Sequence, residues 1–333
     1  MLVELACADA FGACFEGLDK ELIEKHNELK YLTLRDLPSL VPAGSYTDDT
    51  QMTIAIAEEM LGSEWTTIGL ANRFVDCFQR DQRRGYTTAF LLILMNSSSG
   101  AELISKIHGN SKKSGAAMRS SVLGLIKDFN ELERKCLIQS QITHNSPEGK
   151  NSALAAAMMV HYFYYNLGPK IELSAWMNDQ VFGDFWHHPD HWSPTDGKHV
   201  RCHGIDVVEA ALHAIEDNEK LSNVLLDVVG YGGDTDTSAT IAIAAACWSD
   251  EIKQDLPENL IQGLENRTYG IKYLRLLEEK LLEKYPREKK EDIVDGIEEP
   301  PIEDPMDAFG ELVEEYPALF EQNEETDDDT NDN

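Results

Sequence analysis

Two short acidic runs hold the residues with the clearest potential for chemistry. Residues 46–50 read YTDDT, and residues 232–237 read GGDTDT. Each run gathers two carboxylates and neighbouring hydroxyl groups in front of an apolar, helix-spaced segment. Such hard oxygen donors suit Mg²⁺, Mn²⁺ or Ca²⁺. Because the runs lie far apart in the sequence, we predict that the fold brings them together into the two-metal site of a metal-assisted hydrolase.

An ordinary helix N-cap is the alternative explanation of each run. Ser, Thr and Asp before an apolar segment are typical cap residues, and a lone Thr-Asp-Asp favours capping. The second run is harder to explain in this way, because two glycines that permit a sharp turn precede two spaced aspartates. An EF-hand calcium loop is excluded, because loop position 6 counted from Asp48 or Asp234 is not glycine.

The elements that must position these runs are mainly helical. Apolar residues recur at helical spacing in many segments, whereas period-2 alternation is scarce. The clearest segments are residues 2–13, 52–60, 154–163, 207–214, 241–248 and 264–282. We therefore predict an all-α fold, in which alanine-rich stretches at 153–157 and 239–246 allow helices to pack closely.

The negative charge of the chain is concentrated at its end. The 333 residues have a formal net charge of −31, and residues 291–333 supply more than half of it with 18 Asp and Glu and no Lys or Arg. We expect a body over residues 1–290 and an acidic tail over residues 291–333, partly disordered, with a short amphipathic stretch at 306–316. Such acidity disfavours binding to nucleic acid or anionic membranes and would suit a basic protein partner.

The remaining composition indicates a protein of the reducing cytoplasm. The six cysteines form no CxxC pair, so neither a zinc ribbon nor a redox dithiol is indicated. The first residues lack a basic region, and Glu4 and Asp9 interrupt their apolar run, so we expect no signal peptide. No run of 18 apolar residues occurs, so we expect no transmembrane helix.

Four segments, in this order, resemble the motifs of the ADP-ribosylglycohydrolase family, which includes the dinitrogenase reductase-activating glycohydrolases. They are residues 8–16 (ADAFGACFE), 46–52 (YTDDTQM), 113–119 (KSGAAMR) and 232–237 (GGDTDT). The departures are modest: Ala8, Cys14 and Ser114 stand where the family usually has Gly, Pro and Asn. The resemblance spans most of residues 1–250 and implies a compact all-α catalytic domain within residues 1–290.

The resemblance also implies a binuclear centre with two Mg²⁺ or Mn²⁺ ions. Six residues match the family's metal ligands: Thr47, Asp48, Asp49, Asp234, Asp236 and Thr237. Catalytic roles fall to Glu16, Asp49 and Asp234, with Glu16 favoured as the group that accepts or relays a proton.

Seven residues are predicted to contact ADP-ribose: Tyr86, Ser111, Lys113, Ser114, Gly115, His144 and Gly233. Backbone N–H groups of the polar loop 111–115 could cradle a diphosphate, although a plain helix connection is the alternative. His144 follows a Thr, as in the family, but a lone His is also a common structural hydrogen-bonder. Tyr86 could stack on a ring or be an exposed loop residue, and Arg119 is expected to pair with an acidic neighbour rather than with phosphate.

Five histidines between residues 187 and 203, next to Cys202, also raise the alternative of a zinc site. Their spacing fits no standard ligand pattern. We expect instead that this loop borders the cleft and helps to select the target protein.

The resulting hypothesis is hydrolysis of the C1″ bond between ADP-ribose and a protein side chain, with arginine favoured over serine. The expected partners are ADP-ribose, an ADP-ribosylated protein and a cognate ADP-ribosyltransferase. Two alternatives stay open: a non-catalytic protein that binds ADP-ribose or a partner, and a dinuclear-metal phosphohydrolase.

Overall fold

The computed structural model describes residues 1–33, 36, 41–62, 64–182 and 192–287. Residues Met1–Arg287 form one compact unit. In the described part of the chain the regular elements are helices, which confirms the predicted all-α class. A few isolated β-bridges link loops to one another. The expected tail, its amphipathic stretch and its disordered end lie outside the described residues.

The α-helices are α1 (Leu2–Gly12), α2 (Lys20–His26), α3 (Asp48–Leu61), α4 (Thr67–Arg80), α5 (Thr88–Met95), α6 (Gly100–Lys106), α7 (Phe129–Gln141), α8 (Pro147–Tyr164), α9 (Leu173–Met177), α10 (Gly204–Asp217), α11 (Leu221–Gly230), α12 (Thr235–Ala246), α13 (Glu258–Gly263) and α14 (Ile271–Lys284). Short 3₁₀ turns are η1 (Ser114–Ala116), η2 (Ser121–Leu125), η3 (Lys170–Glu172) and η6 (Pro194–Asp196), and η4 (Asn178–Phe182) is a π-helix.

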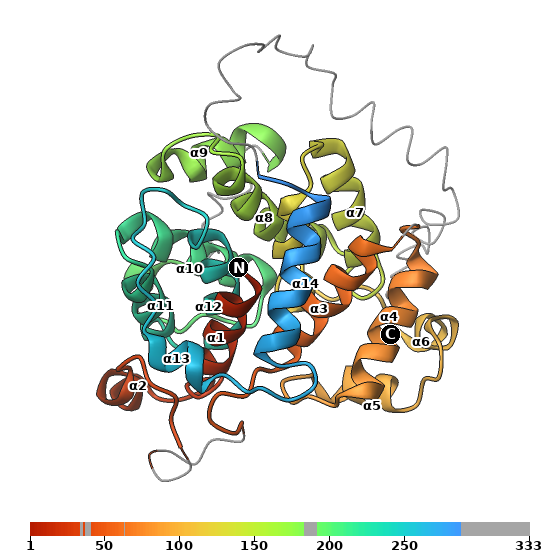
Figure 1. The fold of residues 1–333 in the computed structure, drawn as a ribbon, viewed down its shortest axis with the longest axis horizontal. Helices are drawn as coiled ribbons and strands as arrows, with labels where there is room; N and C mark the ends of the chain where they lie inside the picture. The colour runs from red at the N-terminus through yellow and green to blue at the C-terminus, as the bar shows by residue number, and fades with distance from the viewer. Residues whose placement is uncertain (34–35, 37–40, 63, 183–191, 288–333) are drawn as a thin grey trace, which may run out of the picture. The chain divides into compact units, whose positions relative to one another are not determined.

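Helix α12 lies in the interior and packs against α1, α8, α10 and α11, as Figure 1 shows for α1, α10 and α11. Every residue of α12 is buried, and its alanines let the neighbouring backbones approach closely. At Gly12 a Cβ would lie 2.5 Å from the carbonyl oxygen of Thr235, and the Thr235 hydroxyl donates to the Gly12 carbonyl at 2.8 Å. The end of α1 therefore rests directly on the start of α12, which is the second acidic run.

The helix starts show how far capping explains the two acidic runs. At α3 the cap is Thr47, whose hydroxyl accepts from the Asp49 N–H at 3.4 Å, so both aspartates lie beyond it in the first turn. At α12 the N-cap residue is Asp234, but its carboxylate makes no capping hydrogen bond. Capping therefore accounts for Thr47 and leaves the carboxylates of Asp48, Asp49 and Asp234 for another use.

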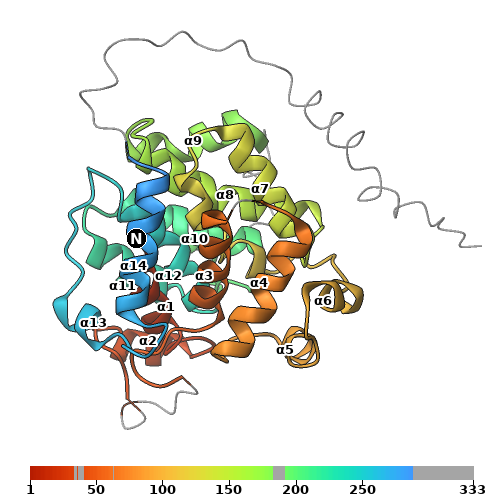
Figure 2. The same cartoon turned by 45° about the vertical axis from the view of Figure 1, so that its right-hand side comes forward.

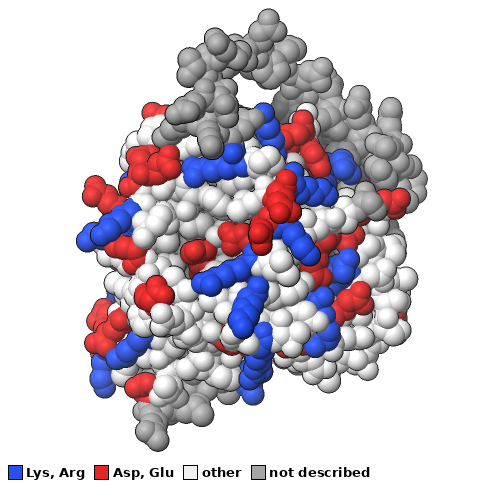
Figure 3. Space-filling view, in the orientation of Figure 1, with Lys and Arg blue, Asp and Glu red and all other residues white. Residues whose placement is uncertain are grey.

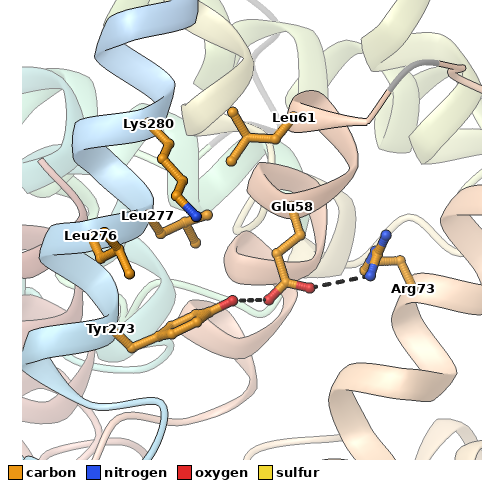
Figure 4. A pocket seen from close by; sticks show the side chains of 7 residues that line it. All are labelled: Glu58, Leu61, Arg73, Tyr273, Leu276, Leu277 and Lys280. Carbon is orange, nitrogen blue, oxygen red and sulfur yellow. Dashed lines mark hydrogen bonds and ion pairs between the residues drawn. The ribbon is translucent and has the colours of Figure 1, made fainter.

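Residues that form structural ion pairs line a small hollow between α3, α4 and α14. In Figure 4, Glu58 of α3 accepts from the Tyr273 hydroxyl and pairs with Arg73. The Arg73–Glu58 ion pair measures 3.4 Å, and Arg80 also donates to this carboxylate, at 3.1 Å. These contacts fasten α14 and α4 to α3, which lies between them in the turned view of Figure 2.

One face of the described body is mixed in charge. On the face in Figure 3, acidic and basic side chains alternate and are not grouped by sign. Among the described helices, none combines the length and apolarity needed to cross a bilayer.

Candidate active site

The two acidic runs meet at one cavity of about 440 Å³, here called the acidic cavity. Its acidic wall comes from the loop after α1 and the starts of α3 and α12, and contains Glu16, Asp48, Asp49, Asp234, Asp236 and Thr237. The predicted convergence of residues 48 and 234 is therefore present. Thr47 and Gly233 do not line this cavity, although the sequence placed both in the site.

Asp9 of α1 fixes the first run, a role that sequence analysis missed. Its carboxylate is fully buried and accepts from the backbone N–H groups of Thr47 and Thr50, with Oδ2 to the Thr50 nitrogen at 3.0 Å. It also accepts from the Thr47 hydroxyl at 2.7 Å and the Thr50 hydroxyl at 2.5 Å. Burial raises the pKa of Asp9, and the hydrogen bonds from both threonines oppose this shift. The sequence signal for this role was Asp9 itself, because it is the single charged residue in the apolar run 5–15.

Asp48 and Asp49 both line the acidic cavity. The Asp48 N–H donates to the Arg84 carbonyl at 2.9 Å, and a Cβ on Gly85 (φ +104°) would lie 1.8 Å from Asp48 Oδ1. Asp49 is 2% exposed, and its Oδ1 has no hydrogen-bond partner. Burial raises the pKa of both carboxyls well above the usual range, with Asp9 adding to the shift of Asp48 and Asp48 adding to that of Asp49. An unpartnered buried oxygen of this kind fits a cation ligand.

The second run is held by two left-handed glycines. Gly232 (φ +71°) and Gly233 (φ +86°) form the bend, and a Cβ on Gly233 would lie 2.0 Å from the Val200 carbonyl oxygen. The Val200 N–H donates to Gly232, and the Asp234 N–H donates to Val200, both at 3.1 Å. Gly233 thus shapes the backbone of the bend, which explains its position outside the cavity lining.

Asp234 and Asp236 make few protein contacts that would occupy their oxygens. Asp234 Oδ2 accepts from the Ser114 hydroxyl at 2.9 Å, which links the second run to the loop 111–115. Asp236 Oδ1 accepts from the Thr237 N–H at 3.0 Å. Burial, with Asp49 and then Glu16 nearby, raises the pKa of Asp236 well above the usual range. Neither of these hydrogen bonds comes from a basic side chain. The site therefore concentrates carboxyl groups that these contacts do not neutralise.

Glu16 and Cys202 form the solvent-accessible edge of the acidic wall. Both side chains are exposed, and their ligand atoms and a carboxylate oxygen of Asp234 all lie within 4.8 Å of one another. Partial burial and the nearby Asp234 raise the pKa of Glu16. Cys202 lines the cavity, which supports the expectation that its loop borders the cleft. From the sequence this thiol was considered only as a neighbour of the histidines in the zinc alternative. Of the five histidines, His187, His188 and His191 lie outside the described residues.

The predicted loop 111–115 lines the opposite side of the acidic cavity. Ser111, Lys113, Ser114 and Gly115 all belong to its wall. A bridge pairs Lys113 with His203, so this loop is tied to the segment that holds the thiol. A Cβ on Gly115 would lie 3.0 Å from His144 Cε1, which shows how closely the loop approaches that ring.

His144 is oriented by a buried chain of hydrogen bonds. Arg119, 1% exposed, donates to the Thr143 hydroxyl at 2.8 Å, and that hydroxyl lies 2.6 Å from His144 Nδ1. Because Thr143 accepts from Arg119, its own proton is free to go to Nδ1, which leaves the ring proton on Nε2. Burial and Arg119 lower the pKa of His144 to about 3, so the ring is neutral at physiological pH.

Arg119 corrects a sequence prediction. We expected it to pair with an acidic neighbour, but its side chain donates to Gln139 Oε1 at 2.6 Å and to the Gln139 carbonyl at 3.0 Å, besides Thr143. The guanidinium carbon lies 4.7 Å above the ring centre of Phe74. Neutral acceptors and an aromatic face therefore satisfy the cation.

Tyr86 is buried in the cavity wall, so the alternative of an exposed loop tyrosine was wrong. It is 8% exposed, and its hydroxyl donates to Gln51 Oε1 at 2.7 Å. Its ring packs against Phe78 and Phe90, with centroids 5.6 and 5.8 Å away. Tyr86, Phe90 and Ile93 give the acidic cavity an apolar wall beside the acidic one.

Comparison with known proteins gives a family match, similar sequences and a similar fold. The ADP-ribosylglycohydrolase family model matches residues 1–291. The ADP-ribosyl-[dinitrogen reductase] glycohydrolase of Rhodospirillum rubrum is 26% identical over 283 residues, covering 78% of this chain and 87% of its own. ADP-ribosylhydrolase ARH3 of Xenopus tropicalis is 32% identical over 167 residues, 46% of each chain. A solved ADP-ribosylglycohydrolase-related protein complex shares the fold, with a TM-score of 0.62 at 20% identity over 85% of this chain and 95% of that one.

Proposed function

From the premise that this chain belongs to the ADP-ribosylglycohydrolase family and is a hydrolase, we propose a specific reaction for it. It cleaves the C1″ glycosidic bond between ADP-ribose and a protein side chain, with arginine preferred over serine. The substrates are ADP-ribosylated proteins, and the reaction opposes that of a partner ADP-ribosyltransferase in the cytoplasm.

One observation supports this proposal above the others: the acidic runs of α3 and α12 share one cavity, and capping does not use the carboxylates of Asp48, Asp49 or Asp234. Asp49 Oδ1 has no partner, and Asp234 accepts from the Ser114 hydroxyl and the Cys202 thiol rather than from its own helix N–H groups. Carboxylates kept buried in this way carry a desolvation cost that a cation would offset.

The donor set fits two Mg²⁺ or Mn²⁺ ions. Five carboxylates and the Thr237 hydroxyl line the acidic wall, and all are hard oxygen ligands. Asp48 and Asp49 would hold the ions from α3, and Asp234 and Asp236 from α12. Thr47, whose hydroxyl is bonded to Asp9, would add a neutral ligand only by sharing that oxygen. When bound, such ions orient the ribose hydroxyls and lower the pKa of an attacking water.

Glu16 is our candidate for the proton acceptor. Its carboxylate is the most accessible of the acidic wall and lies beside Asp234. Its raised pKa brings it nearer to the range in which a carboxylate accepts a proton efficiently. Glu16 would take the proton of the attacking water as the bond to C1″ breaks.

The other walls suit the rest of ADP-ribose. Lys113 brings a positive charge to the polar loop, and Ser114 and Gly115 line the cavity beside it, where their backbone N–H groups would bind a diphosphate. His144 offers a neutral Nε2–H donor close to the same loop. The rings of Tyr86 and Phe90 provide an apolar surface for a base or for the target side chain.

The test measures ADP-ribose released from arginine-modified and serine-modified peptides, with and without Mg²⁺. We expect metal-dependent release of free ADP-ribose, faster from arginine, and its loss in Asp48→Ala and Asp234→Ala. Asp19→Ala is the matched control, because Asp19 is also an N-cap residue without a capping bond but lies exposed at the start of α2. Full activity in both site variants would refute the metal assignment.

The products distinguish the alternatives in the same assay. Free phosphate in place of ADP-ribose would identify a phosphohydrolase. Tight binding of ADP-ribose without turnover, with metal supplied, would identify a binding protein.

A further inference from the structure

An exposed thiol lies among carboxylates at the edge of the acidic cavity. Cys202 is a free cysteine, and its Sγ, a Glu16 oxygen and an Asp234 oxygen lie within 4.8 Å of one another. Among the described residues this is the group of three His, Cys, Asp or Glu side chains found close enough to share an ion. The histidines of the neighbouring loop that the structure describes, His199 and His203, do not belong to it.

The backbone holds this thiol in place from both sides. Val200 pairs with Gly233, just before Asp234, and His203 pairs with Lys113 of the loop 111–115. The Gly204 N–H also donates to the Lys112 carbonyl at 3.0 Å. Cys202 therefore occupies a fixed position between the second acidic run and the opposite wall.

A second observation points to a cation in the same cavity. Asp49, 2% exposed, lines the same cavity, and its buried Oδ1 atom has no hydrogen-bond partner. Hard oxygens alone favour Mg²⁺ or Mn²⁺, whereas a sulfur donor beside them favours thiophilic ions such as Zn²⁺ or Cd²⁺.

We propose that Glu16, Cys202 and Asp234 form a Zn²⁺ site at the edge of the acidic cavity, and that Zn²⁺ bound there inhibits the enzyme. Tetrahedral Zn²⁺ places sulfur and oxygen ligands about 3.6 Å apart, so small side-chain movements close the site. On binding, the S–H bond breaks, a Zn–S bond forms, and the proton goes to solvent without any change of oxidation state. A water completes the four ligands.

Inhibition follows because the site shares two residues with the proposed reaction. Zn²⁺ held by Glu16 and Asp234 withdraws the candidate proton acceptor and one carboxylate of the Mg²⁺ or Mn²⁺ centre. This part of the inference rests on the proposed function, whereas binding of the ion does not.

The test of binding uses the metal-free full-length protein and Cd²⁺, whose bond to a thiolate gives a charge-transfer absorption in the ultraviolet. We expect this band in the native chain, its loss in Cys202→Ser, and at least about tenfold weaker binding in Glu16→Gln. Cys247→Ser is the matched control, because Cys247 is partly exposed but donates to the Ala244 carbonyl at 3.3 Å and does not line the cavity. Circular dichroism verifies that each variant is folded.

Absence of the band in the native chain, or its persistence in folded Cys202→Ser, would overturn the site. For inhibition, we expect Cys202→Ser to need at least about tenfold more Zn²⁺ for half-inhibition at saturating Mg²⁺. An unchanged Zn²⁺ requirement would overturn the inhibitory role. Because the Cd²⁺ band needs no substrate, a failure of the proposed hydrolysis leaves it measurable.

Discussion

Asp128 and Asp234 stand at the same position of two helices and have different roles. Asp128 is exposed, and its carboxylate caps α7 by accepting from the Glu131 N–H at 2.7 Å. Asp234 is 4% exposed, makes no cap for α12, and instead accepts from the Ser114 hydroxyl 120 residues away in sequence. The difference teaches that an aspartate at a helix start becomes a cap or a site ligand according to the tertiary partners around it.

The same contrast occurs at α3. There Thr47 provides the cap, so Asp48 and Asp49 are left to face the acidic cavity. A Thr-Asp-Asp sequence can therefore combine both roles, with the hydroxyl used for the helix and the carboxylates for the site. Asp9 makes this division possible, because it binds the N–H groups and hydroxyls of Thr47 and Thr50.

The largest effect should come from the site aspartates. We expect Asp234→Asn or Asp48→Asn to lower kcat/KM by more than about 100-fold, because losing a direct ligand costs more than the 10–100-fold typical of residues behind the ligands. Steady-state kinetics at saturating Mg²⁺ provide the measurement. A loss of tenfold or less would mean that Asp234 resembles Asp128 after all.

Asp9→Asn tests the residue that orients the first run. We expect metal affinity to fall by roughly 10–100-fold and the free energy of unfolding by about 1–3 kcal/mol, because an amide cannot accept all of the hydrogen bonds that the carboxylate accepts. Isothermal titration with Mn²⁺ and urea unfolding measure the two effects. Unchanged Mn²⁺ affinity in a destabilised variant would limit Asp9 to a structural role.

A pH experiment sharpens the comparison between buried and exposed aspartates. Burial raises the pKa of Asp48, Asp49 and Asp236 above the value of about 3.9 in an unfolded chain. Their contribution to stability is therefore complete below that pH and is lost as the pH rises through the folded-state pKa values.

Bound cations offset this loss, so Mg²⁺ should stabilise the protein more at neutral pH than in mild acid. At 100 times the Kd we expect about 2.7 kcal/mol, or roughly 5 °C in Tm, at neutral pH. Differential scanning fluorimetry measures the difference, and Asp234→Asn should reduce it. A Tm gain that is equal at both pH values would contradict the account.

The smallest effect concerns Asp128→Ala, which removes an ordinary cap. We expect a loss of about 1 kcal/mol in the free energy of unfolding and unchanged kcat/KM. Urea unfolding and the ADP-ribose assay separate the two quantities. A loss of activity at full stability would show that α7 takes part in the site.

The sequence predicted the class of fold, because helical periodicity is a local property. It predicted that the two runs meet, because each is a local cluster of hard ligands and a two-metal site needs both. It did not predict contacts that depend on packing. The partners of Asp9 lie 38 and 41 residues away, and Arg119 is satisfied by Gln139 and Thr143 of α7 and its following turn. Tyr86 is buried because α4 and α5 enclose it, which no pattern in its own loop indicates.

The central claim is that the starts of α3 and α12 hold divalent cations jointly. The most direct test is a crystal soaked with Mn²⁺ and ADP-ribose, with anomalous scattering used to locate the ions. We predict two Mn²⁺ peaks in the acidic cavity, bounded by Asp48 and Asp49 on one side and Asp234 and Asp236 on the other. Ordered ADP-ribose in that cavity without Mn²⁺ between the two runs would contradict the claim.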